Sequence, residues 1–334
     1  MPTHLFSPLR AALFGVLCAA LLIPAAAGAT RPAELRAVDS GGETLAQHTQ
    51  YTGKSKIKTS PDADCFGEGT GGSGEKVTVP GATALGILDD ATGFEKANRF
   101  AGVKPLGVSD FFDFGITVCE IGGAVAPSTG YWYLKVNHIA SQAGADGTRL
   151  RTDDQVLWYL ITDFEAPVPL ELELEVQARA ERESVDQVGV QVWEYADDGS
   201  RSPAKGATVT GASKPTNGAG RTKLDEVPEG GLSDLQAARE GSIPSAFEPL
   251  CVADDLDDCQ TQPPADIFGS DKKDVIRGTR GDDRIYAGKG KDVVRAKKGD
   301  DFVNVRGGGR DIVRCGGGID TVRADKRDKL KGCG

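Results

Sequence analysis

The chain has 334 residues, with 39 Lys and Arg against 49 Asp and Glu, and a formal net charge of −10 at pH 7. Its length and its shifts in composition argue against one single core and indicate two or three small domains. The charge is uneven, because residues 266–334 carry 18 basic and 12 acidic residues (+6), while the remainder carries 21 and 37 (−16). Such an asymmetry is also found in tails that bind polyanions.

The N-terminus has the pattern of an export signal. Arg10 precedes the apolar run 11–23, and small residues follow at 24–29. These three features are typical of a secretory signal peptide, and the run is shorter than the roughly 20 residues that span a bilayer. We therefore expect a signal peptide over 1–29, cleaved near Ala29, and a secreted, extracellular protein that is not an integral membrane protein. Residues 30–54 are expected to be a flexible linker.

Cysteine usage fits an oxidising compartment. Once Cys18 leaves with the signal, an even set remains, and the absence of a C-x-x-C pair disfavours zinc ribbons and thioredoxin-like redox chemistry. Six cysteines permit about 15 pairings. Their order along the chain favours three local disulfides, which are Cys65–Cys119, Cys251–Cys259 and Cys315–Cys333.

Residues 55–164 are expected to form one small domain. The expected elements are strands at 77–79, 111–119, 131–136 and 156–161 and a helix at 83–91. The helix would bury Leu85 and Leu88, and its acidic residues Asp89 and Asp90 would be solvated at its end. His138 is expected in a solvent-facing turn.

This segment resembles the C-terminal domain family of transcobalamin and intrinsic factor. The residues that carry the resemblance are Gly130, Tyr131, Trp132, Asn137, Gly144, Asp146, Asp153, Asp154, Gln155 and Val156. The resemblance implies a β-grasp-like α+β domain and a small-molecule ligand of the cobalamin type. Tyr131, Trp132 and Asn137 are then candidate ligand-binding residues, although aromatic residues in a small sheet also serve as core. His138 and Asp153 depart from the family pattern, which has Gly at both positions.

Residues 165–252 are expected to form an Ig-like or carboxypeptidase-regulatory-like β-sandwich. Leucines and a valine from 170 to 176 alternate with Glu171, Glu173 and Glu175, which predicts a strand with its acids in water. The segment Thr216–Gly220 predicts a turn before another strand at 221–224. Residues 253–265, with their aspartates and prolines, are expected to be an acidic linker.

The C-terminal region contains a repeat of about nine residues. The recurring acids are Asp274, Asp283, Asp292, Asp301, Asp311, Asp320 and Asp328. Two residues after each comes an aliphatic residue: Ile276, Ile285, Val294, Val303, Val313, Val322 and Leu330. Two residues before them glycine dominates, as Gly281, Gly290, Gly299, Gly309 and Gly318. A unit of this length has room for one tight turn and one short strand, whose aliphatic side chain only stacked neighbours can bury.

The repeats of residues 266–334 resemble the hemolysin-type (RTX) nonapeptide G-G-x-G-x-D-x-U-x, which forms a parallel β-roll. The resemblance implies that two repeats form one coil and that Ca²⁺ lies between turns of successive coils. One edge would then use Asp274, Asp292, Asp311 and Asp328, and the other Asp283, Asp301 and Asp320. The turn glycines Gly281, Gly290, Gly309 and Gly318 would assist them. Carboxylate and backbone carbonyl oxygens are ligands that Ca²⁺ prefers.

Basic residues at the variable positions of the repeat oppose a cation. They include Lys272, Lys273, Arg280, Lys289, Lys291 and Arg310, and Lys297-Lys298 replaces two positions of one turn. A roll held by packing and the disulfide alone therefore stays open. The spacing of Cys315 and Cys333 equals two repeats and would place them on adjacent coils, at a strand spacing that a disulfide accepts.

The chain lacks catalytic motifs such as H-E-x-x-H, G-x-S-x-G and a P-loop. We therefore expect a mostly β, multidomain, non-enzymatic protein that binds Ca²⁺ through its roll and acts as a surface or extracellular binding or adhesion protein. Its partners would include calcium and a cell-surface or cell-wall polymer, but no nucleic acid. The alternative is an extracellular carrier of a cobalamin-like small molecule or of a polyanion, with a purely structural roll.

Overall fold

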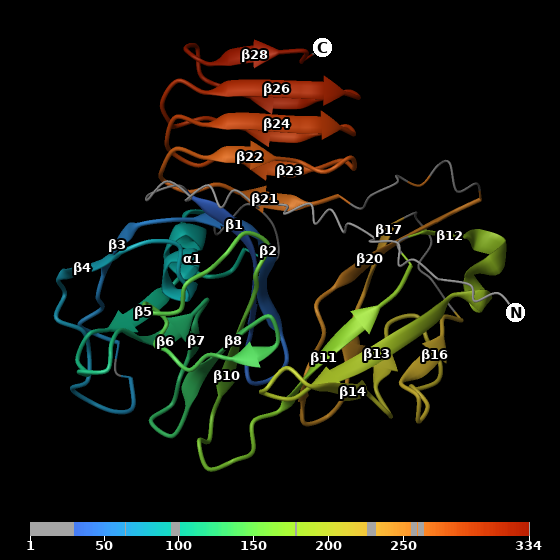
Figure 1. Ribbon diagram of the computed structural model, residues 1–334, viewed down its shortest axis with the longest axis horizontal. Helices are drawn as coiled ribbons and strands as arrows, with labels where there is room; N and C mark the ends of the chain where they lie inside the picture. Colours follow the sequence, from blue (N-terminus) through green and yellow to red (C-terminus); the bar gives the residue numbers. More distant parts are fainter. Residues whose placement is uncertain are drawn as a thin grey trace, which may run out of the picture.

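The computed structural model describes residues 30–63, 65–94, 101–177, 179–225, 232–254, 259 and 264–333. The expected signal peptide, and most of the expected acidic linker at 253–265, lie outside these residues. The described chain is mostly β, as predicted, with several sheets and one short α-helix. Figure 1 shows three parts, with a stack of short strands above two larger β-rich bodies. No helix in the described ranges is both long and apolar enough to cross a membrane.

The N-terminal domain (residues 31–161) is built on a mixed sheet. Its strands are β1 (Arg31–Val38), β2 (Thr44–Thr52), β8 (Tyr131–Val136), β9 (Ile139–Ala140) and β10 (Gln155–Ile161). They run in the order β2-β1-β10-β8-β9, and the central pair β1 and β10 is parallel while the other pairs are antiparallel. The prediction of a flexible linker over 30–54 is therefore wrong.

Strands β1 and β2, which were not predicted from the sequence, bury polar side chains against other parts of the molecule. Ala33, Leu35 and Ala37 enter the hydrophobic core of the N-terminal domain. Arg36 and Gln50, on the same two strands, are buried against residues of the middle domain and of the repeat region. Prediction from hydrophobic periodicity assumes that polar residues face water, so it does not identify strands whose polar side chains are buried.

The single helix α1 (Ala84–Ala91) packs on this sheet, as expected for 83–91. Thr83 caps its N-terminus, because its side chain accepts a hydrogen bond from the N–H of Gly86 at 3.0 Å. Leu85 and Leu88 are fully buried, as predicted. A short 3-10 turn, η1 (Thr92–Phe94), follows the helix.

Two small sheets complete the N-terminal domain. They contain β3 (Ser55–Lys58) with β4 (Lys76–Val79), and β5 (Leu106–Ser109) with β6 (Thr117–Ile121) and β7 (Ala124–Val125). The expected strand at 111–119 begins only at Thr117, and Phe111 and Phe114 are exposed in the preceding loop. Cys65 and Cys119 form the expected disulfide between the loop after β3 and strand β6.

The middle domain (residues 170–253) has two main sheets around one core. The first contains β11 (Leu170–Glu175), β13 (Gly189–Tyr195), β14 (Arg201–Pro203), β16 (Arg221–Lys223) and β19 (Ser242–Ile243). The second contains β12 (Arg179–Glu181), β17 (Leu232–Leu235) and β20 (Glu248–Ala253), and β15 (Thr208–Val209) pairs with β18 (Ala237–Ala238). A 3-10 segment, η2 (Arg182–Gln187), precedes β13. The predicted turn before β16 is present, with the N–H of Gly220 donating to the carbonyl of Asn217 at 2.9 Å.

Glu171 of β11 is buried at 3% exposure, contrary to the expectation that the acids of this strand face water. It forms an ion pair with Arg36 at 2.5 Å and lies 3.3 Å from the ammonium of Lys135 and 3.2 Å from Nδ1 of His138. His138 also stacks on the ring of Tyr195 at 3.8 Å between centroids, so it does not face solvent as predicted. Burial alone would raise the pKa of Glu171, but His138, Arg36 and Lys135 lower it to about 2. This buried cluster joins the N-terminal and middle domains.

The repeats form a two-sheet parallel roll. One sheet contains β21 (Asp266–Phe268), β23 (Arg284–Tyr286), β25 (Phe302–Asn304) and β27 (Thr321–Arg323), and the other contains β22 (Val275–Arg277), β24 (Val293–Lys298), β26 (Ile312–Gly317) and β28 (Lys329–Lys331). The aliphatic repeat residues from Ile276 to Val313 are fully buried between the sheets. Leu330, on the outermost strand of the roll that the structure describes, is 47% exposed.

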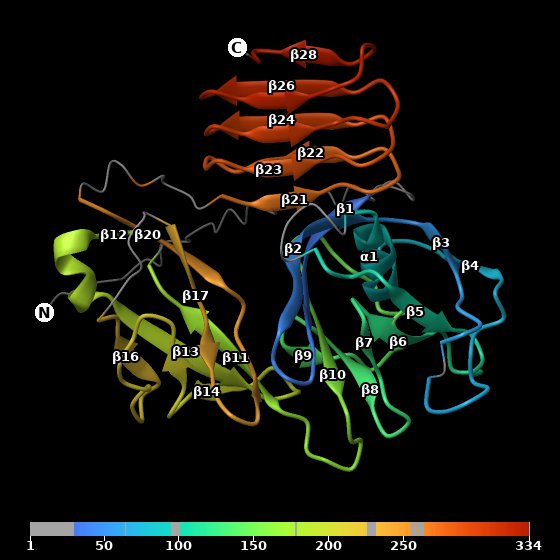
Figure 2. The same ribbon diagram turned by 180° about the vertical axis from the view of Figure 1, so that it is seen from behind.

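The roll continues the sheet of the N-terminal domain. Strand β21 pairs in parallel with β2, with Thr49 opposite Ile267 and Gln50 opposite Phe268. Both views show the roll standing on this edge of the N-terminal domain (Figures 1 and 2). The buried amide of Gln50 donates to the carbonyl of Gly269 at 2.5 Å, and Lys272 forms an ion pair with Asp90 at 2.7 Å. Asp90 is therefore a buried docking residue, not a solvated helix end as predicted.

The two remaining expected disulfides are also present. The Cα atoms of Cys251 and Cys259 lie 5.8 Å apart, and those of Cys315 and Cys333 lie 5.1 Å apart on adjacent coils. The second pair closes the end of the roll, where a bare strand edge would otherwise be exposed.

Replacing Cys315 and Cys333 together by Ser is expected to lower the free energy of unfolding of the roll by about 3 kcal/mol. The bond spans 18 residues, and in the chain-entropy model a cross-link of this span restricts the unfolded chain by that amount. Urea unfolding followed by circular dichroism, without reductant, measures the difference. Identical midpoints for the double variant and the unchanged protein would contradict it.

Candidate metal centre

The structure places the repeat aspartates in the two predicted rows, one on each edge of the roll. Each aspartate lies at the end of a turn, directly before a strand, and successive strands of each sheet stack in register. The first row contains Asp274, Asp292, Asp311 and Asp328, and the second contains Asp283, Asp301 and Asp320.

Within a row, each carboxylate is bonded to the coil below it. The N–H of Asp274 donates to Oδ1 of Asp292 at 2.9 Å, and the N–H of Asp292 donates to Oδ1 of Asp311 at 2.7 Å. The second row repeats the contact, from the N–H of Asp283 to Oδ1 of Asp301 at 2.8 Å and from Asp301 to Asp320 at 3.1 Å. The side chains of Asp292, Asp301, Asp311 and Asp320 are thus held in place by the backbone through one carboxylate oxygen, whereas Asp328 also accepts from the N–H of Asp325 with its Oδ2.

The second carboxylate oxygen, Oδ2, of four row aspartates lacks a hydrogen-bond donor within the part of the chain that the structure describes. Oδ2 of Asp292, Asp301, Asp311 and Asp320 is buried and has no hydrogen-bond partner among the described residues. The side chains of Asp292 and Asp311 have no exposed surface. A buried carboxylate oxygen without a partner is costly in a folded protein, and a bound cation is a common explanation.

The first aspartate of each row is satisfied differently. The N–H and the hydroxyl of Ser270 donate to Oδ2 of Asp274 at 2.6 and 3.1 Å, and Thr279 donates to both oxygens of Asp283. These hydroxyl residues occupy the place of the second repeat glycine. The oxygens that lack a partner therefore belong to the later coils of both rows.

Burial raises the pKa of Asp274, Asp292 and Asp311 in the first row and of Asp283 and Asp301 in the second. The pKa of Asp292 rises to about 8, because burial disfavours its charge and the carboxylates of Asp274 and Asp311 add to the effect. For the same reasons, with Asp283 and Asp320 as neighbours, the pKa of Asp301 rises to about 7. The rows carry stacked negative charge that a cation would neutralise.

The turns that precede the aspartates bring backbone carbonyls close to the carboxylates. Gly290 and Gly318 have φ angles of 132° and 120°, which L-residues rarely adopt. A Cβ on Gly290 would touch the carbonyl of Lys272 one coil below and would lie 2.8 Å from Oδ1 of Asp292. The predicted glycines Gly281 and Gly309 also lie in these turns, and the N–H of Gly281 donates to the hydroxyl of Thr279 at 3.0 Å.

No group of three or more His, Cys, Asp or Glu side chains converges on one point within the residues that the structure describes. A metal ion on a row would therefore be held by carboxylates of adjacent coils together with turn carbonyls. Such an oxygen-only set, flexible in geometry and rich in carbonyls, suits Ca²⁺.

Two basic residues of the turns form ion pairs with acids outside the two rows of aspartates. Lys272 pairs with Asp90 of the N-terminal domain, and Lys289 pairs with the exposed Asp271 at 2.7 Å. Lys297 is different, because its charge lowers the pKa of Asp283 while burial raises it. Its backbone has a φ of 88°, in a region where a non-glycine residue costs about 1–2 kcal/mol.

Lys297→Gly is therefore expected to raise the free energy of unfolding of the roll by about 1 kcal/mol, by relieving this backbone conformation. It should also strengthen calcium binding at the second row, because a competing cation is removed. The neighbouring Lys298→Gly is the control, since residue 298 does not have a positive φ. Thermal unfolding and calorimetric calcium titration of both variants measure these effects, and equal behaviour of the two would contradict the prediction.

The candidate ligand residues of the N-terminal domain do not form a pocket with one another. Trp132 is a core residue at 6% exposure, and Tyr131 packs against a separate hydrophobic cluster that includes Leu157 and Ile243. Asn137 has a φ of 51° and its side chain bonds to Asp154 and to the N–H of Gln155. This placement gives all three residues a role in the fold.

Comparison with known proteins gives one match. Residues 268–303 match the family model of the RTX calcium-binding nonapeptide repeat, with four copies. This family binds Ca²⁺, and the match supports a calcium-binding modular protein. Neither a curated protein nor a solved structure matches the chain.

Proposed function

We propose that this protein is a secreted, non-enzymatic calcium-binding modular protein that acts as an extracellular binding or adhesion protein and whose roll folds with Ca²⁺. The observation that carries the calcium site is the set of buried Oδ2 atoms without partners on Asp292, Asp301, Asp311 and Asp320. The disulfides fit an oxidising, extracellular setting.

The residues of the roll prepare the sites before an ion arrives. The backbone N–H groups of one coil orient the carboxylates of the next, and glycine lets the turn carbonyls approach them. Ca²⁺, when bound, supplies positive charge and accepts the remaining oxygens as ligands. Since the rows form only when coils stack, binding free energy contributes to the folding of the roll.

The N-terminal domain supports an additional proposal about its family. Its sheet has a hairpin, a covering helix and a parallel central pair, an arrangement that supports a β-grasp-like domain of the transcobalamin C-terminal type. A titration with cobalamin tests whether this domain binds a ligand of that type. A saturable change in the cobalamin absorption spectrum supports a carrier, and an unchanged spectrum supports a structural module.

Calcium titration of the complete mature chain tests the main proposal. We expect heat of binding in calorimetry and a higher unfolding temperature of the roll in Ca²⁺ than in EDTA. Each site occupied at about 100 times its Kd adds about 2.7 kcal/mol of stability. Mg²⁺ at the same concentration is the control, because it prefers a stricter geometry and retains its waters. Equal unfolding curves in Ca²⁺ and EDTA would refute a calcium-dependent roll.

The basic excess of the roll favours one rival, a polyanion-binding tail. That function predicts retention on heparin that falls steeply with salt and does not require calcium. Heparin chromatography in Ca²⁺ and in EDTA separates the two functions, because only the calcium proposal predicts a change in folding between the two buffers.

A further inference from the structure

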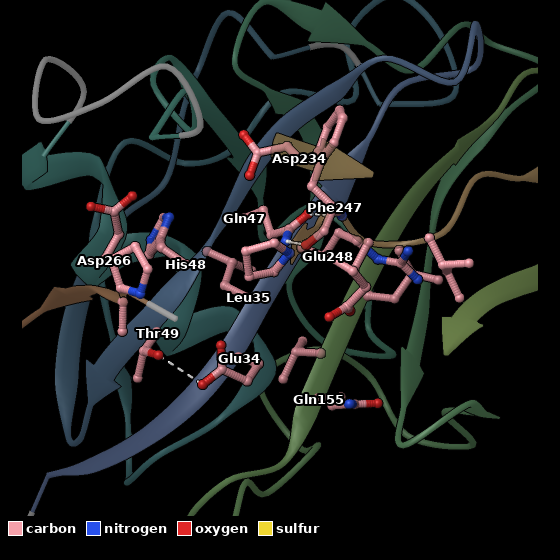
Figure 3. Close-up of a pocket in the computed structure, with 18 of the residues that line it drawn as sticks. Glu34, Leu35, Gln47, His48, Thr49, Gln155, Asp234, Phe247, Glu248 and Asp266 are labelled. Carbon is pink, nitrogen blue, oxygen red and sulfur yellow. Dashed lines mark hydrogen bonds between the residues drawn. The ribbon is translucent and has the colours of Figure 1, made fainter. Parts of the chain in front are cut away.

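A cavity of about 1040 Å³ lies where the three parts of the molecule meet. The N-terminal domain contributes Glu34, Arg36 and His48, the middle domain contributes Glu173 and Glu248, and the roll contributes Tyr286 and Phe302 among other lining residues. Figure 3 shows Glu34, Asp234, Glu248 and Asp266 around this space, on strands from different parts of the chain. Its volume lies at the upper end of the range of small-molecule sites.

The wall formed by the roll is aromatic. The rings of Tyr286 and Phe302 come from successive coils of one sheet and lie 5.6 Å apart between centroids. Phe268 continues the row below Tyr286 at 5.3 Å, and the guanidinium of Arg323 covers Phe302 at 5.2 Å. Rings of this kind offer a flat apolar face to a ligand, and their faces attract cations.

The rest of the cavity lining is acidic. Six carboxylates line the cavity, on Glu34, Glu171, Glu173, Asp234, Glu248 and Asp266, against the two guanidinium groups of Arg36 and Arg284. Arg36 is engaged by the buried Glu171 at 2.5 Å, and Arg284 lies 3.8 Å from Asp266. The side chains of the cavity therefore leave negative charge in excess.

Glu248 contributes most clearly to this excess of negative charge. Its carboxylate has no hydrogen-bond partner within the described part of the chain, whereas Glu34 accepts from Thr49 at 2.7 Å and Glu173 from Tyr195 at 2.5 Å. Burial raises the pKa of Glu248 to about 7, and Glu173 and Glu34 raise it further while Arg36 opposes them. The carboxylates of Glu34 and Glu173, from two domains, thus repel that of Glu248 across one space.

We propose that this cavity is a binding site for an organic cation, in which an ammonium group lies among Glu34, Glu173 and Glu248 and an apolar body lies on the rings of Tyr286 and Phe302. The volume, the aromatic wall and the excess of carboxylates point to the same class of ligand. A single metal ion would use neither the volume nor the rings, and no cluster of metal-binding side chains is found among the described residues. The inference goes beyond calcium binding and requires only that the roll is docked on the N-terminal domain.

The test uses the complete mature chain in Ca²⁺ and two amine probes, phenethylammonium and spermidine, in isothermal titration calorimetry. We expect phenethylammonium to bind with a Kd of about 1 mM or tighter. Its neutral isostere 2-phenylethanol should bind at least about tenfold more weakly, since it lacks the charge. If neither amine gives saturable heat at up to about 10 mM, the proposal is wrong.

Two variants locate the site. Glu34→Gln with Glu248→Gln removes two charges and keeps the shape, and it should weaken the binding of both amines by about tenfold or more. Tyr286→Leu should weaken phenethylammonium more than spermidine, because only the former has a ring to stack. Glu165→Gln, at an exposed loop position outside the cavity, is the matched control. Equal affinity of the double variant and the control would overturn the proposal.

Thermal unfolding of each sample shows that the roll is folded and separates this inference from calcium binding. An amine that binds the cavity while the roll is insensitive to Ca²⁺ supports the cavity and refutes the calcium proposal. If Ca²⁺ stabilises the roll but the double variant binds the amines as tightly as the unchanged protein, the calcium proposal is supported and the cavity proposal is refuted.

Discussion

Asp292→Asn is expected to have opposite effects on the stability of the roll with and without calcium. In EDTA at about pH 9, above the pKa of about 8 that Asp292 has in the folded state, the variant should unfold at a higher temperature, because the amide removes a buried charge that Asp274 and Asp311 repel. Its Oδ1 still accepts the hydrogen bond from the N–H of Asp274. In Ca²⁺ the variant should unfold at a lower temperature than the unchanged protein, since Asp292 is shared by the coils above and below it.

The size of the destabilisation in Ca²⁺ depends on how many calcium sites the Asp292→Asn variant loses. If two adjacent ions are each held at about 100 times their Kd, the variant forfeits about 5 kcal/mol of ligand-linked stability. A change of 1 kcal/mol shifts the midpoint of a small domain by about 4–8 °C, so the effect is easily measured by calorimetric scanning. Asp271→Asn is the matched control, because Asp271 lies in a turn of the same roll but is exposed and pairs with the exposed Lys289. A variant at 292 that is destabilised equally in both buffers would contradict the prediction.

The calcium-free roll is expected to lose stability as the pH rises from about 4 to about 8. Asp292 and Asp301 have pKa values raised to about 8 and about 7, so the folded state retains protons that the unfolded state has already released. For acids with raised pKa values, stability is fully present below the unfolded pKa and is lost as the pH rises through the folded pKa. Urea unfolding in EDTA at a series of pH values measures the slope.

Calcium should reverse this dependence. Binding requires the ionised carboxylates, so it releases the retained protons, and the calcium affinity should rise between about pH 6 and pH 8. Calorimetric titrations in two buffers with different enthalpies of ionisation count the protons released. A calcium affinity that is constant over this range would show that the buried aspartates are already ionised before the ion binds.

The repeat region was the most predictable part of the molecule. Its frame and its inward aliphatic residues follow from a period that is local in sequence, because each coil contacts mainly its neighbours. The two rows of aspartates were implied by the resemblance to the RTX nonapeptide, in which two repeats form one coil. The helix at 84–91 and the strands β8 and β10 were predictable for a similar reason, since their apolar side chains form one local pattern.

The contacts between domains could not be predicted in this way. β1 and β2 appeared to be a linker because Arg36, His48 and Gln50 are polar, yet these residues are buried against parts of the chain about 135 to 220 positions away. Glu171 and Asp90 appeared to be solvated acids, and the residues that bury them come from other domains. The cavity likewise has no signal in the sequence, because each of its walls belongs to a different segment.

The parallel pairing of β21 with β2 changes where assembly of the solenoid starts. A linear array of coils normally has to form its first unit without a neighbour, which is the least favourable step for such a structure. Here a finished strand edge of another domain takes the place of that missing neighbour, so the first coil adds to an existing template. Growth is then directional from β21 to β28, and fraying on loss of ions would begin at the opposite end, where Cys315 and Cys333 join the last two coils.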